Sequence, residues 1–104
     1  MTDITDHRRF ILITVRFFAS FKQITNKRER EINIEEGTTI QQLLEILFDQ
    51  YSALKDKIFD DNNEIRQWIQ ILKNGRNIKF LNGVETILTN GDIIALFPPV
   101  AGGV

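Results

Sequence analysis

The first third of the chain alternates between apolar and polar positions as half-buried strands do. Between Phe10 and Phe18 the odd positions are uniformly apolar and the even positions are mixed. Successive side chains of a strand point to opposite faces of a sheet, so the odd positions are expected to face the core. Phe18 then becomes an exposed aromatic, unless the following loop, with Phe21 and Ile24, covers it. The inward set is Ile11, Ile13, Val15 and Phe17.

A second alternating segment runs from Arg28 to Ile34. Its inward positions are Ile32 and Ile34, and charged or polar residues lie between them. This pattern predicts a strand that forms an antiparallel pair with the first.

The segment from Thr39 to Tyr51 has the period of a helix. Thr39 and Gln42 have the spacing of a capping box, in which each side chain accepts a hydrogen bond from the other residue's backbone N–H. The apolar residues that follow recur at intervals of three and four, which predicts one stripe packed against the sheet. A further helical turn is expected between Ser52 and Phe59. The stripe consists of Ile40, Leu43, Leu44, Leu47 and Tyr51.

Short strands and turns are predicted for the second half of the chain. Asn-Gly occurs at 74–75, 82–83 and 90–91, and this dipeptide favours tight turns. Trp68 to Lys73 and Asp92 to Phe97 are the predicted strands. One helix laid across a small sheet gives an α+β fold class.

Two prolines end the last predicted strand and begin a short tail. Pro98 and Pro99 have no N–H to donate to a sheet, and consecutive prolines favour an extended path. From Pro99 to Gly103 the chain reaches at most roughly 17 Å, at about 3.4 Å per residue. Gly102 and Gly103 have no side chain, so a narrow channel in another protein could admit this end. The alternative is a frayed terminus of small residues.

Composition narrows the possible functions. We expect one domain over residues 10–98, a flexible arm over 1–9 and a flexible tail over 99–104. Thirteen Lys and Arg against fourteen Asp and Glu give a net charge of −1, which offers no electrostatic reason to expect nucleic acid or membrane as a partner.

The sequence contains no cysteine, which excludes disulfides and thiolate metal sites, and His7 is expected to be solvated. The apolar runs are shorter than the about 20 residues of a membrane span, and the charged N-terminus is unlike a signal peptide, so a cytoplasmic protein is expected.

Several short motifs carry a resemblance to a known family. They are Val15–Ala19, Asn74–Arg76, Asn90–Asp92 and Phe97–Gly103. In this order they resemble the MoaD/ThiS sulfur carriers, and most of all the small subunit of molybdopterin synthase, over roughly residues 10–103. The resemblance implies a ubiquitin-like β-grasp fold, in which a mixed sheet has parallel first and last strands. One departure matters, since the active form in this family ends at the second glycine and this chain continues to Val104.

The resemblance also implies a function and a set of partners. An ATP-dependent adenylating enzyme would activate the Gly103 carboxylate, which would become a thiocarboxylate and donate sulfur inside the large catalytic subunit of molybdopterin synthase. A peptidase would first have to remove Val104. No nucleophile–base pair or phosphate loop occurs in the sequence, so the chain is expected to be a carried, non-catalytic subunit that binds no cofactor or metal. The implied reacting end is Gly102 and Gly103, and the implied partner-binding residues are Phe18, Phe97, Pro98, Pro99, Val100 and Ala101.

Two other functions stay open. A ubiquitin-like modifier joined to lysines through Gly103 would also begin with adenylation, so the tail does not separate it from a sulfur carrier. A β-grasp interaction module with an inert tail would account for Val104. The segment from Pro98 to Ala101 favours molybdopterin synthase over modifiers and thiamine-type carriers.

Overall fold

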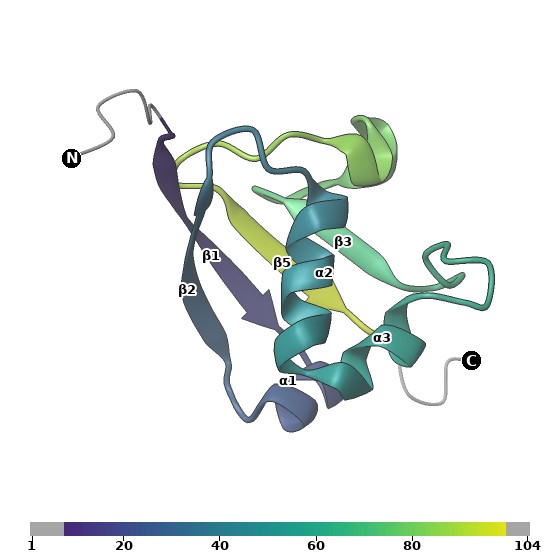
Figure 1. Cartoon of the computed structure of the whole chain (residues 1–104). Coiled ribbons are helices and arrows are strands. Elements are labelled where there is room, and N and C mark those ends of the chain that lie inside the picture. Colours follow the sequence, from purple (N-terminus) through teal and green to yellow (C-terminus); the bar gives the residue numbers. More distant parts are fainter. Residues whose placement is uncertain (1–7, 100–104) are drawn as a thin grey trace.

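A computed structural model describes residues 8–99 of the chain. Its centre is a five-stranded mixed sheet with the strand order β2-β1-β5-β3-β4 (Figure 1). The strands are β1 (Phe10–Phe17), β2 (Glu29–Glu35), β3 (Gln70–Lys73), β4 (Arg76–Asn77) and β5 (Ile93–Phe97). The outer pairs are antiparallel, and β1 and β5 are parallel neighbours. This is the ubiquitin-like β-grasp topology, so the predicted fold class is confirmed.

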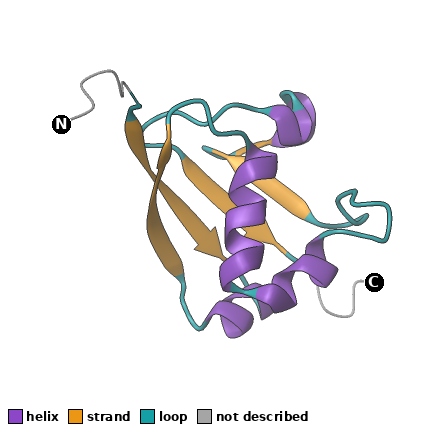
Figure 2. Ribbon diagram, in the orientation of Figure 1, coloured by secondary structure: helices purple, strands orange, loops and turns teal. Residues whose placement is uncertain are grey.

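Helices gather on one face of this sheet. The longest, α2 (Ile40–Gln50), lies across the strands, and α3 (Ser52–Ile58) follows it directly (Figure 2). A third helix, α1 (Ser20–Thr25), joins β1 to β2, and two single 3-10 turns, η1 (Ile78–Phe80) and η2 (Gly83–Glu85), lie between β4 and β5. Within residues 8–99, no helix covers the opposite face of the sheet (Figure 2).

The predicted capping box starts α2. The Gln42 N–H donates to Thr39 Oγ1 over 3.2 Å, and the Thr39 N–H donates to Gln42 Oε1 over 3.0 Å. The apolar stripe that follows is buried except for Tyr51, which lies just after the helix and is half-buried. Its ring packs edge-on against Phe17 at 6.0 Å between centroids.

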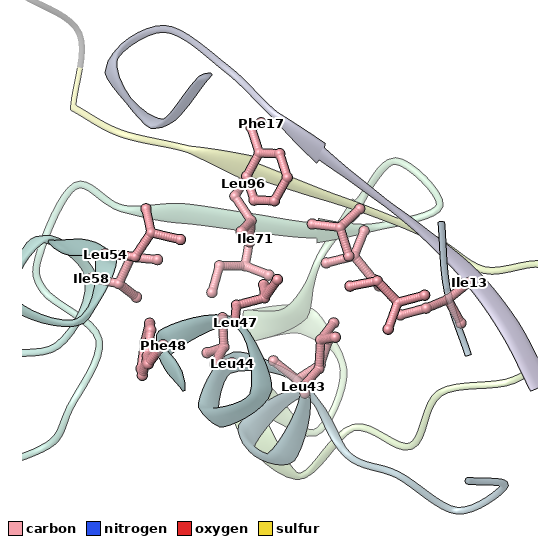
Figure 3. Packing of buried hydrophobic residues seen from close by; sticks show 14 of the residues in the cluster. Ile13, Phe17, Leu43, Leu44, Leu47, Phe48, Leu54, Ile58, Ile71 and Leu96 are labelled. Carbon is pink, nitrogen blue, oxygen red and sulfur yellow. The ribbon is translucent and has the colours of Figure 1, made fainter. Parts of the chain in front are cut away.

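The core lies between α2 and the sheet (Figure 3). The odd positions of β1 are buried as predicted, and the pairs Ile13–Ile32 and Ile11–Ile34 extend the apolar surface onto β2. From the other side, Leu43, Leu44 and Leu47 of α2 meet the side chains of the strands. The two buried residues of α3, Leu54 and Ile58, close one end of the core, so the predicted helical turn is confirmed.

Three local expectations are wrong. The loop expected after β1 contains helix α1, whose Phe21 turns into the core and leaves Phe18 uncovered. The strand expected to start at Trp68 begins at Gln70, because the chain first makes a turn that the Ile69 N–H closes on the Arg66 carbonyl at 3.2 Å. Asn82-Gly83 leads into η2 and does not turn between two strands.

Arg8 and Arg9 are the only residues of the expected arm within the described range, and both contact the body of the domain. A nitrogen of the Arg8 guanidinium lies 3.6 Å from a carboxylate oxygen of Glu35, and the Arg9 carbonyl accepts a hydrogen bond from the Glu36 N–H at 2.8 Å. The rest of the arm (1–7) and most of the tail (100–104) lie outside the described residues.

Candidate functional site

The candidate site begins where β5 ends, at the base of the tail. This strand is held on both sides, by β1 in parallel and by β3 in antiparallel register. Ile94 and Leu96 point into the core and are buried. Phe97 therefore ends the strand on the open face of the sheet, and Pro98 and Pro99 follow it beside α3 (Figure 1).

Phe18 and Phe97 form a stacked pair at this point. The parallel register pairs Phe17 with Leu96, so the next residue of each strand lies beside the other. The two rings are 4.2 Å apart between centroids and 12° from parallel, and the Phe18 N–H donates to the Leu96 carbonyl over 3.3 Å. Phe18 is 37% exposed. The fold thus brings together two aromatic side chains that lie 79 residues apart, and it leaves one surface of the pair open to a partner.

The remaining predicted site residues lie outside the described part of the chain. They are Val100, Ala101, Gly102 and Gly103, together with Val104. The geometry of the site is therefore known from Phe18 and from Phe97 to Pro99.

A buried carboxylate organises the other end of β5. Asp92 is only 4% exposed, and its Oδ1 accepts hydrogen bonds from Asn74 Nδ2 at 2.9 Å and from Thr89 Oγ1 at 3.1 Å. Its Oδ2 accepts from the Thr89 N–H at 2.7 Å and lies 3.5 Å from Lys73 Nζ. Burial by itself raises the pKa of Asp92, but the hydrogen bonds from Thr89 and Asn74 and the ammonium of Lys73 outweigh it and hold this pKa below its ordinary value.

Asn74, in the turn between β3 and β4, bonds to the start of β5 as well as to Asp92. Its Oδ1 accepts from the Ile93 N–H and its own N–H donates to the Ile93 carbonyl, both over 2.8 Å. Asn90 acts in the same way on β1, since its Oδ1 accepts from the Leu12 N–H at 2.9 Å. Two of the motifs that carry the family resemblance therefore fix where β5 starts.

Two kinds of feature are absent from the described residues. Between residues 8 and 99 no three His, Cys, Asp or Glu side chains are grouped so that they could hold a metal ion. No helix in that range is both long enough and apolar enough to cross a membrane.

Comparison with known proteins decides the family. Residues 15–103 match the ThiS family. The chain belongs to this family. The predicted resemblance to the MoaD/ThiS sulfur carriers is thus confirmed, and the match ends at Gly103, one residue before the end of the chain.

Individual ThiS-family relatives are sulfur carriers and small modifiers. Small archaeal modifier protein 3 of Haloferax volcanii is 33% identical over 91 residues, which are 88% of this chain and 98% of that protein. The molybdopterin synthase sulfur carrier subunit of Mycobacterium tuberculosis is 28% identical over 94 residues, which are 89% of this chain and 99% of that one. The solution structure of small archaeal modifier protein 1 from Methanosarcina acetivorans has a TM-score of 0.77 at 34% identity and covers 91% of this chain and 99% of its own.

Sequence patterns missed part of the surface at the tail base. Helix α1 has only six residues, too few for a helical period to be evident. Lys57 and Arg66 lie beside Pro98 and Pro99 in the folded chain, and no local pattern links these two cations. The expected strand also included Trp68, two residues after Arg66, which the structure places in a turn.

Proposed function

We propose that this protein is a sulfur carrier that acts through the carboxylate of Gly103 and serves as the small subunit of a molybdopterin synthase. The observation that carries the proposal is the family match, which runs through the whole β-grasp domain and ends at Gly103. Four residues separate Phe97, the last residue of β5, from Gly102, so the reacting end is attached close to the stacked pair.

The proposed chemistry needs a partner for each step. The Gly103 carboxylate is a poor electrophile, so an adenylating enzyme joins it to the α-phosphoryl group of ATP and releases pyrophosphate. A sulfur donor then displaces AMP from the acyl carbon and leaves a thiocarboxylate, which attacks the pterin precursor inside the large catalytic subunit. The chain supplies no acid, base or metal ligand to these steps, and the use of ATP fits a cytoplasmic protein.

The stacked pair supports this role as a surface for the large subunit. Aromatic side chains that are buried on association often contribute much of the binding energy. Phe18 and Phe97 lie at the base of the tail, so a partner that receives the tail in a channel can cover them at the same time. Pro98 and Pro99, and then Val100 and Ala101, would lie along the entrance to that channel.

A second function is favoured by the relatives. The 33% identity to small archaeal modifier protein 3 supports a ubiquitin-like modifier that is joined to lysines through Gly103. Both functions begin with the same adenylate, and they differ in whether sulfur or a lysine amine displaces AMP.

The proposal is tested by identifying the product that a chain ending at Gly103 forms. It is incubated with ATP, a sulfur donor and the adenylating enzyme of its host, and its intact mass is measured. We expect one oxygen to be replaced by sulfur, and we expect the product to yield molybdopterin when the large subunit and the pterin precursor are added. An unchanged mass would refute the sulfur carrier, and lysine-linked conjugates without molybdopterin would support the modifier.

A matched control is the chain that lacks Gly102 to Val104. Among the described residues the buried core ends at Leu96, so the unfolding transition is expected to stay unchanged. Thiocarboxylate formation is expected to disappear. A large loss of stability would show that the terminal residues belong to the folded body.

A further inference from the structure

A groove of about 500 Å³ lies beside the base of the tail. Helix α3 supplies Asp56 and Lys57 to its wall, the segment before β3 supplies Arg66, and the first tail residues, Pro98 and Pro99, complete it. We call it the tail-base groove. Because the prolines form part of its wall, whatever occupies the groove lies directly against the start of the tail.

The groove wall holds two cations and one carboxylate, and neither cation has an ion-pair partner among residues 8–99. No carboxylate oxygen of residues 8–99 lies within 4.0 Å of Lys57 Nζ or of the Arg66 guanidinium. Arg66 is nevertheless held in place, since its Nε donates to the Asp56 carbonyl at 2.7 Å and its backbone N–H donates to the Ile58 carbonyl at 2.7 Å. A guanidinium fixed in this way can receive a carboxylate with little loss of side-chain freedom.

The turn that holds Arg66 also presents a tryptophan to solvent. Trp68 is 70% exposed and has a φ of 75°, at the third position of the turn closed by Arg66 and Ile69. A glycine favours this backbone, whereas a bulky side chain strains it. Strained and exposed residues are found at binding sites, and tryptophan is among the residues that contribute most to binding.

The turn also borders the tail-base groove. The antiparallel pairing of β3 and β5 ends at Gln70 and Phe97, and the turn directly precedes this pair. Arg66, the first residue of the turn, lines the groove together with Lys57 of α3 and with Pro98, and Trp68 follows Arg66 by two residues.

We propose that the tail-base groove is the docking site for an acidic segment of the adenylating enzyme that activates the tail, with an adjacent apolar side chain of that segment packed on Trp68. Charge complementarity identifies the occupant, because the groove wall holds two cations, Lys57 and Arg66, against one carboxylate, Asp56, and neither cation has an ion-pair partner within residues 8–99. Phe18 and Phe97 do not line the groove, so it offers the partner a contact in addition to the stacked pair. This inference rests on the proposed function, since it assumes that a partner protein receives the tail.

The first experiment measures ATP–pyrophosphate exchange by the adenylating enzyme of the host, with the carrier ending at Gly103. The test variant is Lys57→Glu/Arg66→Glu, and the matched control is Lys27→Glu/Lys79→Glu, which changes the net charge equally at exposed positions elsewhere. We expect the KM for the carrier to rise about tenfold in the test variant at low salt and to approach that of the control at high salt, with kcat unchanged, because reversed rim charges slow association. Equal KM values for the two variants would overturn the proposal while leaving the proposed function intact.

If the unmodified carrier supports no exchange, the proposed function fails. A second measurement then tests whether the groove binds an acidic segment. Trp68 is the only tryptophan of the chain, so its fluorescence reports directly on this surface. We expect titration with a glutamate-rich peptide at low salt to change the emission of the full chain and of the control variant, but not that of Lys57→Glu/Arg66→Glu. No change, or the same change in all three proteins, would refute the docking site.

Trp68→Gly separates binding from folding. Glycine relieves the positive φ, so the melting temperature is expected to stay the same or rise, while the KM in the exchange assay is expected to increase. A marked fall in melting temperature with an unchanged KM would show that Trp68 serves the fold and would remove it from the docking site.

Discussion

Asn74 donates a hydrogen bond from Nδ2 to Oδ1 of Asp92 over 2.9 Å, and this contact joins two turns that lie 18 residues apart. Asn74 also holds Ile93, the first residue of β5, and Asp92 accepts a hydrogen bond from the Thr89 N–H in the turn that precedes the strand. The strand that leads to the tail is thus positioned at its start by a buried carboxylate and an amide.

The first prediction is that Asp92 contributes stability only when it is ionised. Its pKa is held below the ordinary value in the folded protein, so this contribution is fully present above the unfolded pKa of about 3.9 and is lost as the pH falls through the folded pKa. Asp92→Asn should lower the free energy of unfolding at neutral pH by about 1.5–3 kcal/mol, the usual range for hydrogen bonds to a charged group. Urea unfolding of both proteins from pH 7 down to about pH 3 measures this, and the difference should shrink at the acidic end. A difference independent of pH would mean that the charge of Asp92 is not what matters.

The second prediction concerns the buried face of α2. Leu44 is fully buried beneath the sheet, so Leu44→Ala should lower the free energy of unfolding by about 2–5 kcal/mol. Asp49→Ala, at an exposed position of the same helix, is the control and should change it by less than about 0.5 kcal/mol. Equal effects of the two substitutions on the denaturation midpoint would contradict the assigned helix face.

The third prediction separates binding from folding at the stacked pair. Phe97 lies on the open face and stacks on a partly exposed Phe18, so Phe97→Ala should weaken the complex with the large synthase subunit by about 2 kcal/mol or more. The melting temperature should change much less. Calorimetric titration and thermal unfolding of the same variant provide the two values. An unchanged association constant with a large fall in melting temperature would place Phe97 in the core.

Much of the fold could be predicted because its signals are local. The alternation of β1 and β2 and the capping box of α2 identify each element and its buried face from neighbouring residues alone. Where a short segment depends on distant contacts, prediction was wrong. Ser20 to Thr25 begins only three residues after β1 ends, and its helix depends on the core that Phe21 enters.

The candidate site could be predicted only in part for the same reason. Motif positions indicated Phe18 and Phe97, and the structure adds that they stack, which depends on the parallel register of β1 and β5. The bonds of Asn74 to Asp92 and the approach of Arg66 to the tail join segments that are distant in sequence. The turn at Trp68 breaks a local rule, since a positive φ is rare for so large a side chain, and a local pattern therefore could not indicate it.

The last prediction is that the chain is a precursor and that a peptidase must remove Val104. The family match ends at Gly103, and an adenylating site that accepts two glycines is shaped around the absence of side chains. Val104 adds a β-branched side chain and moves the carboxylate about 3.4 Å beyond the reacting position. Displacement by about 1 Å can already lower a rate about a hundredfold. ATP–pyrophosphate exchange should therefore be supported by the chain that ends at Gly103 and be nearly absent for the chain that ends at Val104. Incubation with an extract of the host should restore exchange to the longer chain, with the loss of one valine visible in its intact mass. Equal exchange by both chains would mean that Val104 needs no removal.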